Sequence, residues 1–188
     1  SALAEIHTED GNYIGVNTRR IDAPSKVTGK LRYAGDMVMP GMLHVAVLRS
    51  PFPHARIVSI DTSAAEVMEG VEGVITSADV PGVDNFGVFV NDQPVLARGK
   101  VRYAGEQVAA VAAESELIAK RACASIKVVY EPLPAVLDCD AAMKPGAPVV
   151  HDYAPDNITK HIPIRKGDAE KALAECDLVI ENVYETQP

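Results

Sequence analysis

Side chains that could bind a metal ion or attack a substrate are scattered along this sequence. His54 follows a proline turn and His151 lies in a connector, and neither has a partner at metal-ligand spacing. His44 falls within an apolar run, where a hydrogen-bonded core or edge histidine is far more common than a metal ligand. The histidines therefore do not predict a metal site.

The cysteines, glycines and serines give no stronger signal. The three cysteines are far apart and lack CxxC spacing, which disfavours zinc and iron–sulfur sites and indicates free thiols in a reducing cytoplasm. Neither the phosphate loop GxxxxGK[ST] nor the hydrolase motif GxSxG occurs. Glu106, after Gly105, could be a catalytic carboxylate, although a solvent-exposed turn glutamate is the preferred interpretation. Residue by residue, the sequence predicts a soluble α+β domain of unknown role.

Composition excludes several classes of function. The 188 residues are 47% hydrophobic and 23% charged, as in ordinary globular domains. A net charge of −8 disfavours nucleic acid as a partner, because phosphate binding needs clustered Lys and Arg. No apolar run is long enough to span a bilayer and no signal peptide is recognisable, so neither a membrane partner nor secretion is expected.

The first half of the chain predicts three strands and a helix. Residues 43–50 are apolar on nearly both faces, which indicates a buried strand. Residues 55–61 alternate as a half-buried strand, with Ile57 on the face opposite Val58 and Ile60. Next come a helix that starts with capping-box spacing at Ser63 and Glu66, and a strand over residues 71–76.

The second half predicts a strand–helix–strand crossover unit. Strands are expected over residues 101–104 and 107–114, a helix capped by Ser115 to about Ile126, and a strand over residues 127–131. Further on, we expect a short helix over residues 138–143, a connector over residues 144–163, a helix capped by Asp168, and a strand over residues 178–185. Strands mixed with short helices favour the α+β class.

The segment of residues 79–91 does not look like an ordinary loop. It is rich in Gly, Pro and Asp, yet it carries Phe86, Val88, Phe89 and Val90. Loops normally face water and are polar. These side chains either pack locally or on a neighbour, or they form a surface that binds something.

Eight short phrases, in order, are similar to the start of the molybdenum-binding subunit in the xanthine dehydrogenase and aldehyde oxidase family. Each phrase is weak alone, but their order over residues 20–134 is specific. The phrases are RIDAPSKVTG (20–29), PGMLH (40–44), SPFPHARI (50–57), IDT (60–62), VEGV (71–74), SADVPG (77–82), VRYAGEQVA (101–109) and YEPLP (130–134).

The resemblance implies an α/β hammerhead with a mixed sheet and short helices. It divides the chain into an N-terminal arm (1–19), a hammerhead domain (20–150) and a segment (151–188) that leads toward molybdopterin-binding domains. Residues 178–187 resemble the strand that leads to the first molybdenum-facing loop, so we expect a truncated piece of a longer protein. Family members hydroxylate a carbon next to a heteroatom or carbonyl. Catalytic and molybdopterin-binding residues lie in later domains, so the resemblance assigns no catalytic, cofactor or metal residue here.

The same resemblance implies partners and one pair of site residues. The complete enzyme would carry molybdopterin with molybdenum, and pass electrons to [2Fe–2S] clusters and often FAD on partner domains or subunits. Phe89 and Val90 correspond to positions that help to wall the substrate funnel in xanthine dehydrogenase-like members. The substrate stays open among purines, aldehydes, nicotinate, CO and aromatic CoA thioesters. The alternative is a stand-alone hammerhead binding or interaction module without redox activity.

Overall fold

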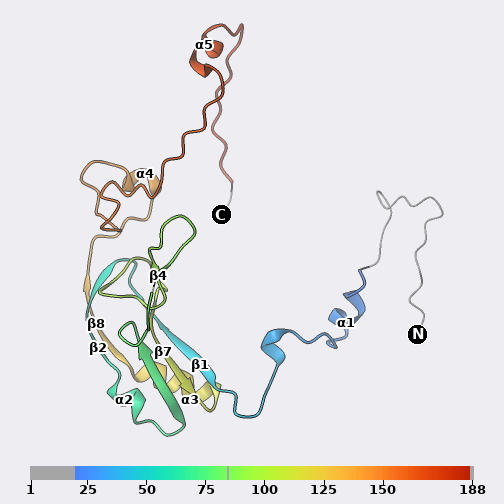
Figure 1. Cartoon of the computed structure of the whole chain (residues 1–188), viewed down its shortest axis with the longest axis vertical. Helices are drawn as coiled ribbons and strands as arrows, with labels where there is room; N and C mark the ends of the chain where they lie inside the picture. The colour runs from blue at the N-terminus through green and yellow to red at the C-terminus, as the bar shows by residue number, and fades with distance from the viewer. Residues whose placement is uncertain (1–19, 84, 187–188) are drawn as a thin grey trace, which may run out of the picture.

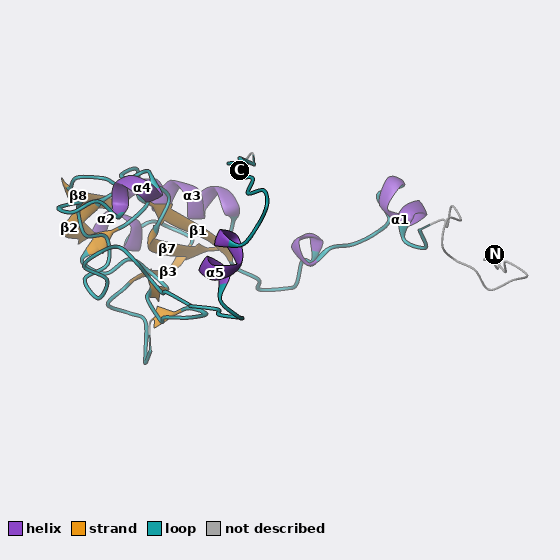
Figure 2. Cartoon of the chain, turned by 90° about the horizontal axis from the view of Figure 1, so that it is seen from above, coloured by secondary structure: helices purple, strands orange, loops and turns teal. Residues whose placement is uncertain are grey.

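The computed structural model describes residues 20–83 and 85–186 (Figure 1). The N-terminal arm expected over residues 1–19 lies outside the described residues. The body lies between residues 44 and 132. The segment before it and the segment that carries the last helix, beyond about residue 163, extend away from it (Figures 1 and 2). No helix in the described part is long and apolar enough to cross a membrane.

The first sheet has three antiparallel strands. β1 (His44–Arg49) and β3 (Val71–Thr76) flank β7 (Gln107–Ala113), which is almost completely buried. The helix α3 (Glu116–Ser125) packs on β1 and β7, and the short helix α2 (Ser63–Glu66) packs on α3 and β3. The core between helices and sheet is made of mostly small side chains: Ala65, Ala109, Val111, Ala122, Cys123 and Ile126.

The helix α3 forms as the sequence predicts. Ser115 is the N-cap, and its hydroxyl oxygen accepts the backbone N–H of Ile118 at 3.3 Å. Ala119 and Ala122 are completely buried, and such small residues let the helix approach the sheet closely. Val111 in β7 and Ile126 at the end of α3 belong to this core and are 0% and 7% exposed.

The strand β1 is not buried on both faces, so that prediction was wrong. It is an edge strand, and its residues alternate between half-buried and exposed. Ala46 and Leu48 face the core, whereas Val45 is 65% exposed and Val47 is 37% exposed. The reason is that helices cover only one face of this sheet.

The second sheet places β2 (Ala55–Asp61) between β6 (Lys100–Val101) and β8 (Lys127–Pro132), again with antiparallel pairing. Val58 interrupts the register between β2 and β8 as a β-bulge. Because of this bulge the predicted alternation was wrong. Ile57 and Ile60 both pack on the core, and Val58 faces out. A second cluster forms here from Ala55, Ala97, Val101 and Val108.

The predicted crossover unit is also wrong. The strands β7 and β8, on either side of α3, belong to different sheets. Every strand pair among the described residues is antiparallel, where a mixed sheet was expected. The α+β class itself is confirmed, with α2 and α3 packed on the first of the antiparallel sheets.

The ends of the helices and the flanking segments differ in part from expectation. Thr62, not Ser63, is the N-cap of α2, and the hydroxyl of Ser63 donates to Asp61 instead. The expected helices appear as α4 (Cys139–Ala142) and α5 (Ala169–Ala174), each capped by an aspartate. In the segment before the body, α1 (Ala23–Val27) and a 3₁₀ turn (Ala34–Asp36) were not predicted. The strand expected over residues 178–185 is absent, and that segment is exposed.

Candidate functional site

A hairpin carries the unusual apolar segment away from the body. Its two short strands, β4 (Asn85–Phe86) and β5 (Gln93–Pro94), pair antiparallel (Figure 1). The turn between them is tight, because the N–H of Asp92 donates to the carbonyl of Val90 at 3.0 Å. A Cβ at Gly87 would lie 1.8 Å from that same carbonyl oxygen, so this backbone path requires glycine.

The apolar side chains of the 86–90 loop (residues 86–90) are largely exposed. Phe89 is 68% exposed, Val88 93% and Phe86 56%, while Val90 is half-buried. Local packing in the domain's own core therefore does not account for Phe89. One partner does lie nearby: the ammonium of Lys160 sits 5.1 Å from the centre of the Phe89 ring, within cation–π range.

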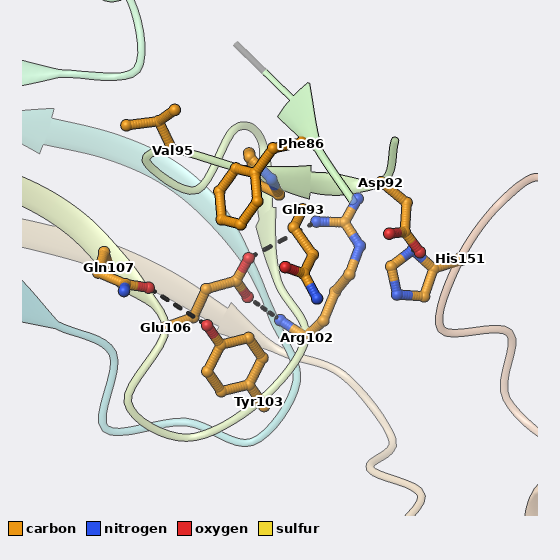
Figure 3. A pocket seen from close by; sticks show the side chains of 10 residues that line it. Phe86, Asp92, Gln93, Val95, Arg102, Tyr103, Glu106, Gln107 and His151 are labelled. Atoms are coloured by element: carbon orange, nitrogen blue, oxygen red, sulfur yellow. Dashed lines mark hydrogen bonds and ion pairs between the residues drawn. The ribbon is translucent and has the colours of Figure 1, made fainter. Parts of the chain in front are cut away.

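Beside the loop lies a pocket of about 290 Å³ (Figure 3). Its walls come from the hairpin, from the turn between β6 and β7, and from the connector (residues 144–163). Apolar Phe86 and Val95 and polar Gln93, Gln107 and Arg102 line it. The pocket therefore joins three segments that are distant in sequence.

Glu106 is the buried acid of this pocket. It is only 3% exposed, and its carboxylate accepts the backbone N–H of Arg102 at 2.5 Å (Figure 3). The guanidinium Nη1 of Arg102 lies 3.8 Å from the other carboxylate oxygen. Burial raises the pKa of Glu106, and the Arg102 contacts oppose that rise without cancelling it. The expectation of a solvent-exposed turn glutamate was therefore wrong.

The backbone of the β6–β7 turn explains why Glu106 points inward. Gly105 adopts φ +93, a conformation that side chains rarely allow. Two backbone hydrogen bonds then tie the turn to Ser50: the Gly105 N–H donates to the Ser50 carbonyl at 2.8 Å, and the Ser50 N–H donates to the Glu106 carbonyl at 2.9 Å. The turn is thus folded back over the body, and Glu106 is enclosed.

A second polar cluster joins the hairpin to the connector. The hydroxyl of Tyr153 donates to Asp92 Oδ2 at 2.7 Å, and His151 Nδ1 lies 3.7 Å from the same oxygen. Burial lowers the pKa of His151, with a further contribution from Arg102, so the ring is neutral near pH 7. The hydroxyl of Tyr153 is the hydrogen-bond donor to Asp92, because His151 Nδ1 at 3.7 Å lies beyond hydrogen-bond distance.

The connector is more ordered than its sequence indicates, and Asn157 is the reason. This residue adopts φ +59, which asparagine tolerates better than most side chains. Its amide donates to the carbonyls of Ala142 and Pro148, both at 3.0 Å, and its oxygen accepts the N–H of Val150 at 2.9 Å. The sequence shows only an isolated Asn in a Pro-rich stretch, so this role was missed.

The other side chains considered as catalytic or metal-binding candidates include one buried histidine and three cysteines. His54 is 5% exposed, and its Nδ1–H donates to the Pro134 carbonyl at 2.7 Å. Cys123 is buried, Cys139 and Cys176 are exposed, and all three are free thiols. Among the described residues, no three His, Cys, Asp or Glu side chains come together to hold a metal ion. The described residues of the site form a surface that could contact a small molecule.

Comparison with known proteins gives consistent matches. The family described as "Aldehyde oxidase and xanthine dehydrogenase, a/b hammerhead domain" matches residues 28–134. A probable subunit of xanthine dehydrogenase from Bacillus subtilis is 45% identical over 166 residues, which is 88% of this chain and 22% of that protein. The nicotinate dehydrogenase large molybdopterin subunit of Eubacterium barkeri is 35% identical over 178 residues, which is 95% of this chain and 41% of that protein.

Solved structures agree with the sequence matches. Quinoline 2-oxidoreductase from Pseudomonas putida 86 superposes with a TM-score of 0.66 at 44% identity, over 74% of this chain and 19% of the other. A Cu,Mo-CO dehydrogenase superposes with a TM-score of 0.72 at 35% identity, over 85% of this chain and 22% of the other. The chain thus spans less than half the length of each of these proteins.

Proposed function

The chain belongs to the aldehyde oxidase and xanthine dehydrogenase hammerhead family, and we propose that it is a non-catalytic segment of a molybdenum-dependent hydroxylase or dehydrogenase. The expected fold and family are confirmed by the match over residues 28–134. In the complete protein, we propose, this segment frames the molybdopterin site and part of the substrate funnel. The observation that carries the funnel role is the exposure of Phe89 on an apolar loop that projects from the body.

The described residues do not fit molybdopterin or molybdenum as a resident group. They bring no three candidate ligands together, and the single buried acid among them, Glu106, is satisfied by Arg102. We therefore propose that the molybdopterin is held by other domains of the same subunit. The [2Fe–2S] clusters and FAD belong in this proposal to further domains or subunits, and the assembly to the cytoplasm.

The 86–90 loop would act by shape and by exclusion of water. Ligand sites are mostly apolar with a few polar anchors, so Phe89 and Val90 suit a flat or apolar small-molecule substrate. The loop contributes no proton acceptor of its own, because its side chains are all apolar. Its effect should therefore appear in discrimination between substrates of different size, and not in the chemical step.

We expect Phe89→Ala in the complete enzyme to change selectivity by size. The test compares kcat/KM for the largest and the smallest substrates that the wild type oxidises, from a panel of benzaldehyde, acetaldehyde, quinoline and pyridine. Loss of part of an apolar pocket contact should change the free energy of discrimination, which is RT times the logarithm of that ratio, by about 1–3 kcal/mol. Molybdenum content should not change, because the residue lies on an exposed loop and binds no cofactor.

The matched control is Val67→Ala, which truncates another exposed apolar side chain (85%), at the end of α2. It should leave the ratio at the wild-type value. An unchanged ratio in Phe89→Ala would show that the loop does not wall the funnel.

A further inference from the structure

Asp92 lies at the base of the hairpin, between the 86–90 loop and β5. Its backbone N–H closes the turn by donating to Val90, while its side chain points away from the loop toward the connector (Figure 3). The side chain is only 19% exposed, which is low for a carboxylate on a projecting hairpin. One residue therefore contacts both the loop and the segment behind it.

The nearest side-chain partner of the Asp92 carboxylate is the hydroxyl of Tyr153. Tyr153 donates to Asp92 Oδ2 at 2.7 Å, and a hydrogen bond to an ionised acceptor is stronger than one between neutral groups. This contact joins positions 61 residues apart in sequence. The hydrogen bond that Tyr153 donates to Asp92 also raises the pKa of Tyr153.

The connector that carries Tyr153 is itself anchored. Asn157 makes three hydrogen bonds within residues 142–157. In the same segment, Asp152 accepts a hydrogen bond from the ammonium of Lys100 in β6 at 3.0 Å. Asp152 and Tyr153, adjacent in sequence, thus tie the connector to the body and to the hairpin respectively. Farther along, Lys160 reaches the Phe89 ring at 5.1 Å.

We infer that Asp92 is a positioning residue, which holds the 86–90 loop against the connector through Tyr153 and so sets the substrate selectivity of the loop. It does not touch the substrate itself. The inference rests on the proposed funnel role of Phe89 and Val90 for its functional part, whereas the structural part stands on the Asp92–Tyr153 contact alone.

The structural part is tested by nuclear magnetic resonance on the 188-residue chain. Asp92→Ala should lower the backbone order parameters of residues 88–90 from about 0.85, typical of ordered backbone, toward 0.6 or below. Tyr153→Phe should lower these order parameters as well. The double variant should lower them no further than Asp92→Ala does, because both changes remove the same contact. Asp92→Asn keeps an acceptor oxygen and should restore most of the order.

The control is Asp140→Asn, which removes an exposed carboxylate in α4 away from the hairpin. It should leave the loop's order parameters unchanged. If Asp92→Ala leaves those values at the wild-type level, the inference is overturned whatever the enzyme does.

The functional part uses the complete enzyme and the same substrate panel. Asp92→Ala should shift the large-to-small kcat/KM ratio in the same direction as Phe89→Ala, by about fivefold, with molybdenum content intact. Should Phe89→Ala change the ratio while Asp92→Ala does not, the inference fails and the proposed function stands. Should neither variant change it, the funnel role fails, and the selectivity assigned to Asp92 fails with it.

Discussion

At the scale of single residues, Glu106 shows how backbone geometry changes the character of a side chain. A Gly-Glu pair between two strands is typical of an exposed turn. Here the positive φ of Gly105 and the hydrogen bonds to Ser50 fold that turn inward. Sequence pattern could not show this, because the residues that enclose Glu106 come from the hairpin and the connector, far away along the chain.

The raised pKa of Glu106 predicts a specific dependence of stability on pH. A carboxyl group whose pKa is higher in the folded state contributes stability below its unfolded pKa, and loses that contribution as pH rises through its folded pKa. The wild type should therefore lose stability as pH rises from about 4.5, and Glu106→Gln should not show this loss. The amide oxygen would keep the hydrogen bond from Arg102.

Urea unfolding midpoints at several pH values between 4 and 7 would measure the effect. The difference between variant and wild type should move in favour of Glu106→Gln as pH increases. Val67→Ala, at an exposed position at the end of α2, changes no ionisable group. It serves as the control and should show no such trend. A constant difference across the pH range would contradict the assigned shift.

At the scale of elements, α3 and β7 carry the core of the first sheet. Ile126→Ala at the end of α3 should destabilise the chain by about 2–5 kcal/mol, because it leaves a cavity among side chains that are already small. Val45→Ala, on the exposed face of β1, should cost much less. Denaturant midpoints compare the two, and equal losses would mean that the assigned faces are wrong.

Elements with strong local signals could be predicted from the sequence, and their pairing could not. The Ser115 cap and the apolar spacing in α3 are local, and the helix begins and ends where they indicate. The strand β1 looks buried because Val45 and Val47 are apolar, but its edge position follows from tertiary pairing. The bulge at Val58 is likewise invisible to a period-two pattern.

The candidate site divides in the same way. The family resemblance, together with the apolar character of a turn-rich segment, identified Phe89 and Val90. The structure places Phe89 in the open and Val90 half-buried. The sequence did not identify Asp92, Tyr153 or Asn157 as the residues that support the loop, because their contacts span long distances in sequence. Whether Phe89 and Val90 face a substrate stays a prediction.

At the scale of the whole molecule, the described chain has more exposed apolar side chains than its own core explains. They include Val38, Val45, Val88 and Ile180, which lie on the segments before and after the body, on the uncovered face of the first sheet and on the hairpin. Large exposed apolar areas mark surfaces that contact other domains or ligands. This distribution supports the proposal that the segment packs against other domains of a larger subunit.

The molybdenum content of two purified proteins tests the central claim most directly. The 188-residue chain and the complete polypeptide that contains it are expressed under the same conditions, with molybdate supplied, and analysed for metal by mass spectrometry. We expect stoichiometric molybdenum in the complete polypeptide and none in the 188-residue chain, because its described residues offer no set of ligands. Stoichiometric molybdenum in the short chain, or a complete polypeptide that binds none and oxidises no substrate, would contradict the account.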